Sequence, residues 1–250
     1  MIQEPVLINQ KTLIIGANSA IAKALAVKVA DTQNTGLIVI SRNIAAYTQS
    51  PLANTEHIEV PDYSQNSIEA VVNSIKACLS VPITRVYICH GILHSHTVKP
   101  EKRLEDFDPN AFIEVLTANA LTPLLWIKAL TDIITSNVEC KVTVFSARVG
   151  SISDNHLGGW YSYRTSKAAL NMLLKTVSIE FSRRAKNIKI ISFHPRTTDT
   201  LLSKPFQKNV PEGKLFTCDF VANQLISIVN DIAIDGELSY VDWQGRNIDW

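Results

Sequence analysis

The feature that most constrains this chain is a regular alternation of short apolar runs with longer helical periods. Seven runs, most of them rich in Ile and Val, have the length and composition of parallel strands that are buried on both faces. They cover residues 12–15, 37–41, 58–60, 85–89, 141–145, 188–193 and 238–241. The pattern continues nearly to the last residue, so the whole chain follows one architectural scheme.

Between these runs, apolar residues recur at the spacing of a buried helix face. Ile21, Leu25 and Val29 follow the first run at i, i+4 and i+8. Residues 118–130 are predicted to form a second, well-buried helix. A third apolar stripe, from Leu170 to Phe181, predicts a long helix that ends near residues 183–184.

Strand–helix alternation predicts right-handed βαβ crossovers. We therefore expect an α/β fold, a Rossmann-type doubly wound parallel sheet of about seven strands with helices on both faces. No repeat, low-complexity tract or linker interrupts the sequence, so residues 1–250 are expected to form a single domain. Ligands bind such sheets at the carboxyl ends of the strands, beside the point where the strand order reverses.

Charge and cysteine content exclude several classes of function. The net charge is +1 with acids and bases mixed along the chain, which argues against a nucleic-acid partner. The four cysteines form no CxxC pair, so we expect no metal site and a reducing, cytoplasmic location. Residues 1–5 show no signal-peptide pattern, and no apolar run is expected to reach the ~18–20 residues of a membrane span. No membrane partner is predicted.

The first strand is followed by a tight turn at Gly16 and a helix that opens near Ser19. A helix N-terminus presents free N–H groups and partial positive charge, which suit a pyrophosphate. Small side chains allow the phosphates to approach, and Ala20 and Ala22 occupy two such positions. A glycine after a first strand can equally be an ordinary turn, so this segment alone leaves dinucleotide binding open.

The second strand ends in Ser41 and Arg42, with no carboxylate at its tip. An acidic residue there would bind the ribose diol of NAD, whereas an arginine would bind the 2′-phosphate of NADP. NADP is therefore favoured over NAD, although Arg42 could also be an ordinary surface residue.

Tyr163 and Lys167 are four residues apart at the head of the long helix, so their side chains share one face. A phenol is a poor acid or base near neutral pH, because its reference pKa is about 10. An ammonium group nearby favours the phenolate and lowers that pKa, so Tyr163 could exchange a proton with a carbonyl oxygen or an alcohol. A lone Tyr-x-x-x-Lys is also common on helix surfaces.

The motifs around Tyr163 and Lys167 indicate which of these two interpretations, a catalytic pair or ordinary helix surface, applies. A strand ends in Ser146, a Gly-containing loop follows, and Tyr163-x-x-x-Lys167 opens the next helix, with Gly16-x-x-x-Ala20-x-Ala22 near the N-terminus. In this order, the whole chain resembles the short-chain dehydrogenase/reductase family. The run from Ala147 to Asn171 looks most like its C-factor and Sniffer-like carbonyl reductase branch.

The resemblance implies roles for individual residues. Tyr163 matches the acid/base, Lys167 the residue that lowers its pKa and holds the nicotinamide ribose, and Asn119 the helix asparagine that supports the lysine through water. Thr198 and Thr200 match positions that meet the carboxamide and phosphates, and Asp62 and Tyr63 match positions that flank the adenine. The full set expected to bind the cofactor is Gly16, Asn18, Ser19, Ala20, Ile21, Ser41, Arg42, Asp62, Tyr63, Cys89, His90, Gly91, Pro195, Thr198 and Thr200.

The chain departs from the family pattern at several positions. Cys89 stands in place of an asparagine, and Arg196 follows Pro195 where a glycine is usual. Aligning Gly150 with the family's loop glycine puts Ala147 in the column of the catalytic serine. We choose Ser146, one residue earlier, as the hydroxyl that orients the carbonyl, with Ser151 in reserve.

The resemblance implies an NADP(H)-dependent oxidoreductase that transfers hydride between nicotinamide and a carbonyl or alcohol substrate. The alternative is a cofactor-binding regulatory or signalling protein with little turnover.

The helices that carry Asn119 and Tyr163 commonly pair in this family, so a homodimer or homotetramer is expected. Residues 200–216 are expected to be an irregular lid, and Trp160 and Tyr161 to be packing or dimer contacts. His94 and His96 lack a third ligand for a metal.

Overall fold

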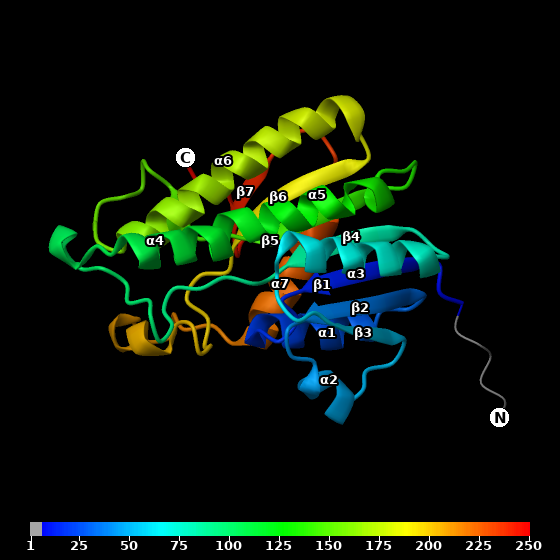
Figure 1. Ribbon diagram of the computed structural model, residues 1–250, viewed down its shortest axis with the longest axis horizontal. Coiled ribbons are helices and arrows are strands. Elements are labelled where there is room, and N and C mark those ends of the chain that lie inside the picture. Colours follow the sequence, from blue (N-terminus) through cyan, green and yellow to red (C-terminus); the bar gives the residue numbers. More distant parts are fainter. Residues whose placement is uncertain (1–6) are drawn as a thin grey trace.

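Seven strands form one parallel sheet in the computed structural model, which describes residues 7–250 (Figure 1). The order is β3-β2-β1-β4-β5-β6-β7, and every neighbouring pair is parallel. The strands are β1 (Gln10–Ile15), β2 (Thr35–Ser41), β3 (Thr55–Glu59), β4 (Ile83–Ile88), β5 (Cys140–Phe145), β6 (Ile188–His194) and β7 (Ser239–Asp242). The predicted doubly wound α/β sheet is confirmed.

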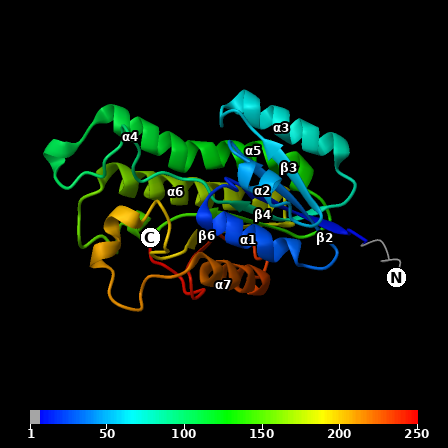
Figure 2. The same cartoon turned by 90° about the horizontal axis from the view of Figure 1, so that it is seen from below.

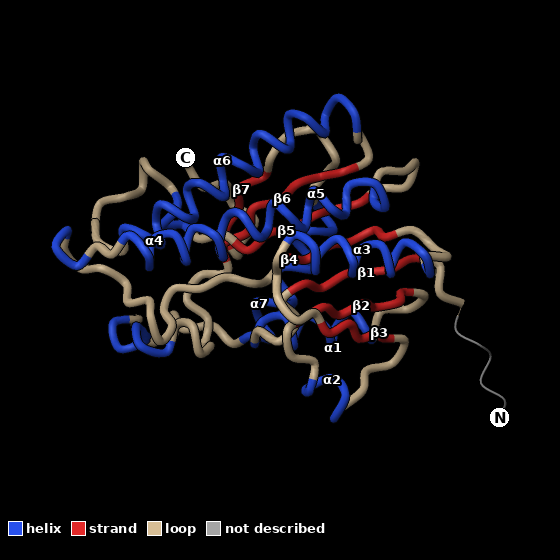
Figure 3. The backbone as a smooth tube through the Cα atoms, viewed as in Figure 1, coloured by secondary structure: helices blue, strands red, loops and turns tan. Residues whose placement is uncertain are grey.

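Helices cover both faces of this sheet (Figures 2 and 3). The main helices are α1 (Ala20–Ala30), α3 (Gln65–Cys78), α4 (Pro109–Leu116), α5 (Thr122–Ile134), α6 (Tyr161–Arg184) and α7 (Cys218–Asp231), with a short α2 (Ala45–Gln49). Helices α3, α5 and α6 lie on one face, and α1 packs on α7 on the other.

Successive residues of the central strands point into two separate apolar cores. Leu13 and Ile15 of β1 belong to the core beneath α3, α5 and α6, whereas Ile14 belongs to the core beneath α1 and α7. Side chains alternate between the two faces of a strand, and here both faces are dry. This double burial explains why these strands appear in the sequence as continuous apolar runs.

The bounds of two elements, and the expectation that no segment reaches the length of a membrane span, need correction. Strand β3 covers Thr55–Glu59 instead of 58–60, because it is an edge strand with polar, partly exposed residues and only its end is apolar. The helix expected at 118–130 extends from Pro109 to Ile134, through a π-helical turn at Thr117–Leu121. Segment Pro109–Ile134 is therefore also long and apolar enough to span a membrane by length and composition. Its buried side chains, among them Trp126 and Leu130, pack in the core.

The N-terminal residues on which the expectation about a signal peptide rests lie outside the described residues.

The strand order reverses between β1 and β4, and the backbone is closely packed there. Gly16, just after β1, has φ +74°, which favours glycine. A Cβ at Gly16 would lie 2.8 Å from both the backbone nitrogen and the Cβ of His90, just after β4. The turns that follow the two strands therefore meet at the carboxyl edge of the sheet, where this fold binds ligands.

Helix α6 is packed against the loop after β5 at Gly150. A Cβ there would lie 2.8 Å from the carbonyl carbon and the Cβ of Lys167. The absence of a side chain at Gly150 therefore lets the helix approach the sheet at the level of Lys167.

We predict that Gly150→Ala lowers the free energy of unfolding by about 1–3 kcal/mol, because backbone atoms of α6 cannot move aside easily. Gly36→Ala is the matched control, since its Cβ would meet side-chain carbons of Ile8 and Lys11 at 3.2 and 3.4 Å. Urea denaturation measures both. Equal stabilities for the two variants would contradict the close packing at Gly150.

Candidate functional site

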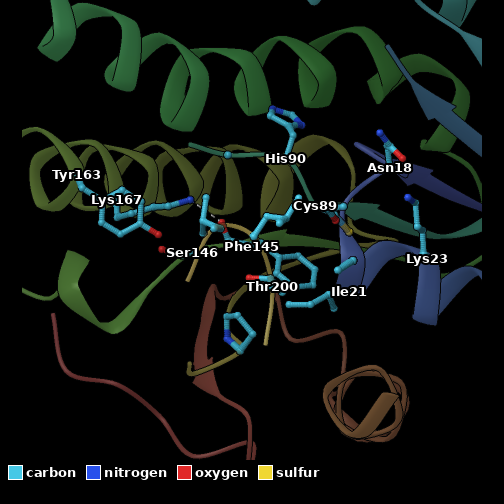
Figure 4. A pocket seen from close by; sticks show the side chains of 16 residues that line it. Asn18, Ile21, Lys23, Cys89, His90, Phe145, Ser146, Tyr163, Lys167 and Thr200 are labelled. Carbon is cyan, nitrogen blue, oxygen red and sulfur yellow. Dashed lines mark hydrogen bonds between the residues drawn. The ribbon is translucent and has the colours of Figure 1, made fainter. Parts of the chain in front are cut away.

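A cavity of about 360 Å³ opens at the carboxyl ends of β1, β4, β5 and β6 (Figure 4). Tyr163, Lys167 and Ser146 lie together at one end of it, and Asn18 and Lys23 lie at the other. Its lining residues are Asn18, Ser19, Ala20, Ile21, Lys23, Cys89, His90, Gly91, Phe145, Ser146, Tyr163, Lys167, Pro195, Thr200, Leu201 and Leu202.

A second cavity, of about 890 Å³, continues from the first toward the end of β2. The two share Asn18, Ser19, Cys89, His90 and Gly91 as walls, so they form one elongated cleft. The second cavity is lined in addition by Gly16, Ser41, Arg42, Asn43, Tyr63, Ser64, Ile92, Glu114, Thr117, Ala118 and Thr122.

The start of α1 faces the first cavity. Ser19 is the N-cap residue, and its hydroxyl accepts from the backbone N–H of Ala22 at 3.3 Å. Ala20 and Ile21 of the first helical turn line the cavity, so the positive end of the helix dipole lies against it. Lys23, in the same turn, adds a full positive charge to this wall. The arrangement suits an anionic group such as a pyrophosphate.

Arg42 and Tyr63 form the far end of the cleft. The Arg42 guanidinium carbon lies 5.2 Å from the centroid of the Tyr63 ring. Arg42 is exposed, and among residues 7–250 no carboxylate forms an ion pair with it. The guanidinium is therefore available for an anion in the second cavity.

His90 lines the cleft where the two cavities join. Its ring centroid lies 5.1 Å from that of Tyr63, and neither ring nitrogen has a hydrogen-bond partner within the described part of the chain. Burial, reinforced by the charges of Lys167 and Arg42, lowers the pKa of His90 to about 3. The neutral ring thus keeps one donor and one acceptor unused. A buried, unpaired imidazole in a cleft wall fits a polar ligand.

Tyr163 and Lys167 face each other, as their spacing predicted. The Lys167 Nζ lies 5.8 Å from the centroid of the Tyr163 ring and donates to the backbone oxygen of Phe145 at 2.9 Å. Burial lowers the pKa of Lys167 to about 8. The ammonium group is therefore held in the cavity wall at an electrostatic cost.

The sequence predicted a lowered pKa for Tyr163, and for the chain without a cofactor this direction is wrong. Burial raises the pKa of Tyr163 above its ordinary value, and Tyr240 raises it further. Desolvation disfavours the phenolate, and the Lys167 ammonium hydrogen-bonds to Phe145, so the desolvation dominates. Tyr163 is a protonated phenol at neutral pH.

Asn119 connects the loop after β4 to α6. It lies in the π-helical turn and is fully buried. Its Oδ1 accepts from Ile92 N at 2.7 Å, and its Nδ2 donates to Ile92 O at 2.8 Å and to Ser166 Oγ at 3.0 Å. A Cβ at Gly91 would lie 3.1 Å from Asn119 Oδ1 and 3.4 Å from Lys167 Nζ. Asn119 is therefore beside Lys167, but its hydrogen bonds are structural.

Of the two candidate serines, Ser146 lies at the cavity and Ser151 does not. Ser146 Oγ donates to Asn171 Oδ1 at 2.8 Å, and Ser151 Oγ accepts from Asp154 N at 3.1 Å. Ala147 offers no hydroxyl, and its backbone oxygen accepts from Tyr240 OH. To donate to a substrate, Ser146 would have to exchange its bond to Asn171, since a hydroxyl has one hydrogen.

Asp62 and Thr198 are expected cofactor residues that line neither cavity. Asp62 is exposed and accepts from the backbone N–H of Ser64 at 2.9 Å, which starts the turn into α3. Thr198 is buried, and its hydroxyl donates to backbone oxygens of its own loop at 3.4 Å. Both side chains stabilise turns, a role that strand-end position alone cannot distinguish from ligand binding.

Several lining residues escaped the sequence analysis, chiefly Lys23, Phe145, Leu201 and Leu202. Lys23 is four residues after the N-cap, so its helical spacing from Ser19 was a usable signal. The two leucines belong to the segment 200–216 that was expected to be a lid, but only the folded loop shows which of its side chains reach the cavity.

The segment expected to be an irregular lid contains a 3₁₀ helix at Lys204–Asn209. Its Phe206 ring lies 4.9 Å from the Trp160 ring, and Trp160 lies 6.1 Å from Tyr163. Trp160 therefore packs as expected between the segment and Tyr163.

His94 Nε2 lies 3.1 Å from Leu202 O, and within residues 7–250 no three potential metal ligands come together.

Comparison with known proteins identifies the family. A family profile described as short chain dehydrogenase matches residues 10–211. The chain is 25% identical to the 1-hydroxy-2-glutathionyl-2-methyl-3-butene dehydrogenase of Rhodococcus sp. strain AD45, over 95% of the chain and 98% of that protein. It is 28% identical to the C-signal protein of Myxococcus xanthus, over 59% of the chain and 83% of that protein.

Two solved structures share the fold. The carbonyl reductase Sniffer of D. melanogaster superposes with a TM-score of 0.81 at 19% identity, over 97% of this chain and all of that one. An NADPH-bound carbonyl reductase from chicken fatty liver superposes with a TM-score of 0.80 at 19% identity, over 98% of this chain and all of that one.

The similarities to C-signal and Sniffer agree with the branch expected from the sequence. Because the family profile covers most of the chain, the protein belongs to the short-chain dehydrogenase/reductase family and is an NAD(P)-dependent oxidoreductase.

Proposed function

We propose that the protein is an NADP(H)-dependent carbonyl reductase, with Tyr163 as its acid/base and Lys167 as its assistant. The observation that carries this proposal is one cleft with cations at three places along it. Arg42 lies at one end, Lys23 and the start of α1 in the middle, and Lys167 beside Tyr163 at the other end. The 2′-phosphate and the pyrophosphate of NADP(H) would match the first two of these places, and Lys167 would lie beside the nicotinamide ribose.

The residues present fit NADP(H). Arg42 would pair with the 2′-phosphate, and the first turn of α1 with Lys23 would hold the pyrophosphate. The free imidazole nitrogens of His90 would meet polar atoms of the adenosine half, since His90 and Tyr63 both line the second cavity. Alanines at positions 20 and 22 leave less room than glycines, and Lys23 would compensate with its charge. When bound, the nicotinamide would supply or accept the hydride.

The protonation states favour reduction of a carbonyl. Because burial raises its pKa, the Tyr163 phenol carries a proton at neutral pH and would donate it to a carbonyl oxygen. Lys167, with a pKa of about 8, is mostly charged at pH 7 and would stabilise the phenolate that remains. Ser146 lies beside Tyr163 and Lys167 in the cavity and would orient the carbonyl after exchange of its bond to Asn171.

The alternative, a cofactor-binding regulatory protein, is favoured by positions at which the chain departs from the family's sequence pattern. Ala147 provides no hydroxyl in the column of the catalytic serine, and the similarity to C-signal points the same way. Arg196 adopts a left-handed conformation with φ 63° and lies over the Phe216 ring instead of leaving the space a glycine would leave.

A cytoplasmic location and a homo-oligomer stay predictions. All four cysteines are free thiols, which supports a reducing compartment. Exposed apolar side chains on α4 and α6, such as Ile113 and Met172, support a contact between copies of the chain.

The first prediction from this proposed function concerns Tyr163→Phe. It should reduce NADPH oxidation by about 10²-fold or more on any aldehyde or ketone that the protein accepts, because the proton donor is lost. The dissociation constant for NADPH should stay within about twofold, since cofactor binding does not need the hydroxyl. Tyr161→Phe, exposed two residues earlier in the same helix, is the control.

Full turnover by Tyr163→Phe would contradict the assigned acid/base. Tight NADPH binding by the unmodified protein without turnover on a broad panel of carbonyl compounds would favour the regulatory alternative.

The second prediction concerns cofactor choice. Arg42→Ala should weaken NADPH binding about 10- to 100-fold, the value of one or two charge-assisted hydrogen bonds. NADH binding should change little, because NADH lacks the 2′-phosphate. Arg183→Ala, an exposed arginine at the far end of α6, is the control. Fluorescence titration with both nucleotides measures the ratio, and an equal loss for both would remove Arg42 from the phosphate site.

The third prediction concerns Lys167→Met and pH. The pKa of Lys167 is about 8 in the folded chain and about 10.4 when unfolded. Below pH 8 the lysine is charged in both states, so the folded chain bears the whole cost of burying that charge. As pH rises from 8 to about 10, the unfolded chain holds more protons than the folded chain, and that penalty disappears.

Lys167→Met should therefore be more stable than the unmodified protein at pH 7 by about 1–3 kcal/mol, an advantage that shrinks toward pH 10. Loss of the bond to Phe145 makes the gain smaller than the full penalty. Urea denaturation at both pH values measures it, with the exposed Lys128→Met of α5 as control. A difference that does not vary with pH would show that Lys167 is not held charged at a cost.

A further inference from the structure

We propose that Glu101, in the loop between β4 and α4, is a positioning residue that caps α6 from outside the helix and holds Tyr163 in the cavity. Nothing in its sequence position points to this, because Glu101 lies 61 residues before Ser162, the helix residue that it binds. The inference rests on the proposed function, since it concerns how Tyr163 is oriented for proton transfer.

Helix α6 begins without a cap of its own. The residue before its first turn is Trp160, which has left-handed backbone angles (φ 53°, ψ 45°) and makes no side-chain capping bond. The first N–H groups of a helix have no partner inside it, and Ser, Thr, Asp or Asn normally accept from them. An indole cannot do this, because it has no acceptor.

Glu101 provides the missing acceptors. Its backbone oxygen accepts from Trp160 N at 2.6 Å, and both carboxylate oxygens lie 3.3 Å from Ser162 N. The hydroxyl of Ser162 donates to Oε1 of the same carboxylate. One residue thus satisfies donors on both sides of the helix start.

The carboxylate of Glu101 depends on this contact as much as the helix does. Glu101 is only 4% exposed, and within residues 7–250 no Lys, Arg or His forms an ion pair with it. A buried carboxylate is unfavourable unless donors replace the water it has lost. The positive end of α6 and the Ser162 donors fill that role, so breaking the contact would leave the carboxylate buried without a partner.

Tyr163 lies between this anchor and a second one. Ser162, before it, is bound to Glu101. Arg164, after it, donates from Nε to the backbone oxygens of Gly159 at 3.0 Å and Gly158 at 3.3 Å. The residues on each side of the phenol are therefore held by different loops, which resists rotation of the first turn about the helix axis. Proton transfer is sensitive to misplacement of about 1 Å.

The loop before the helix also packs on Glu101. A Cβ at Gly159 would lie 3.3 Å from the backbone oxygen of Glu101, and Gly159 has φ +65°. Gly158 and Gly159 thus let the chain turn sharply just before the residues that contact Glu101.

The test compares Glu101→Ala and Glu101→Gln with Glu105→Gln, an exposed glutamate in the next turn of the same loop. Glu101→Ala should lower kcat about 10-fold or more, because the phenol loses its fixed position. The dissociation constant for NADPH should stay within about twofold, and KM should change less than kcat. Glu101→Gln should recover most of the rate, since its amide oxygen still accepts from Ser162. Glu105→Gln should match the unmodified protein.

A second measurement does not need turnover. Ultraviolet difference titration against Tyr163→Phe reports the pKa of the phenol. Burial raises that pKa, so Glu101→Ala should move it down toward the ordinary value as water enters. This readout separates the two proposals, because it applies even if the unmodified protein reduces no carbonyl compound.

The proposal would be overturned by an unchanged kcat and phenol pKa in Glu101→Ala. It would also be overturned if Glu101→Ala lost NADPH affinity in proportion to kcat, which would indicate a general loosening of the fold. Should Glu101→Ala fail to fold, Glu101→Asp decides, because its shorter side chain withdraws the acceptor from Ser162. A lower kcat and a lower phenol pKa at unchanged NADPH affinity support the proposal, and values equal to those of the unmodified protein overturn it.

Discussion

Burial of the central strands on both faces is the constraint on which the rest of this structure depends. Because β1 and β2 direct successive side chains into two dry cores, each connection must cross a face of the sheet as a helix. All the strands then end at the same edge, where the turns after β1 and β4 meet at Gly16 and His90. The cleft lies there because the order of strands reverses at that point.

The chemistry of the cleft follows from desolvation. A lysine buried in its wall titrates near pH 8 and a histidine near pH 3, while the pKa of the Tyr163 phenol is raised. In each case the neutral form gains, as expected where water is excluded. An anionic ligand beside Arg42 and Lys23, as proposed for NADP(H), would favour the charged forms of neighbouring cationic side chains and would keep the Tyr163 phenol protonated.

The segment that carries Tyr163 illustrates how a site depends on distant backbone. Helix α6 follows Trp160, whose backbone is left-handed and whose side chain caps nothing, so a glutamate from another loop accepts from N–H groups at the helix start. Gly150 lets the body of the helix approach the sheet, and Arg164 binds the loop before it. These contacts involve ordinary residues, yet together they set where the phenol lies. Changes at such positions are expected to alter rate more than affinity for the cofactor.

Sequence alone determined the features that depend on local pattern. Continuous apolar runs predicted six of the strands closely, because both their faces are buried, and i, i+4 spacing placed Tyr163 and Lys167 on one side of α6. The bounds predicted for the edge strand β3 were wrong, because its partly exposed residues are mostly polar and leave no continuous apolar run. The tertiary structure alone decided that Asp62 and Thr198 stabilise turns, that Ser146 and not Ser151 reaches the cavity, and that Glu101 caps α6. Those outcomes depend on contacts between residues far apart in the chain, and on how much water each group loses, neither of which is encoded in local spacing.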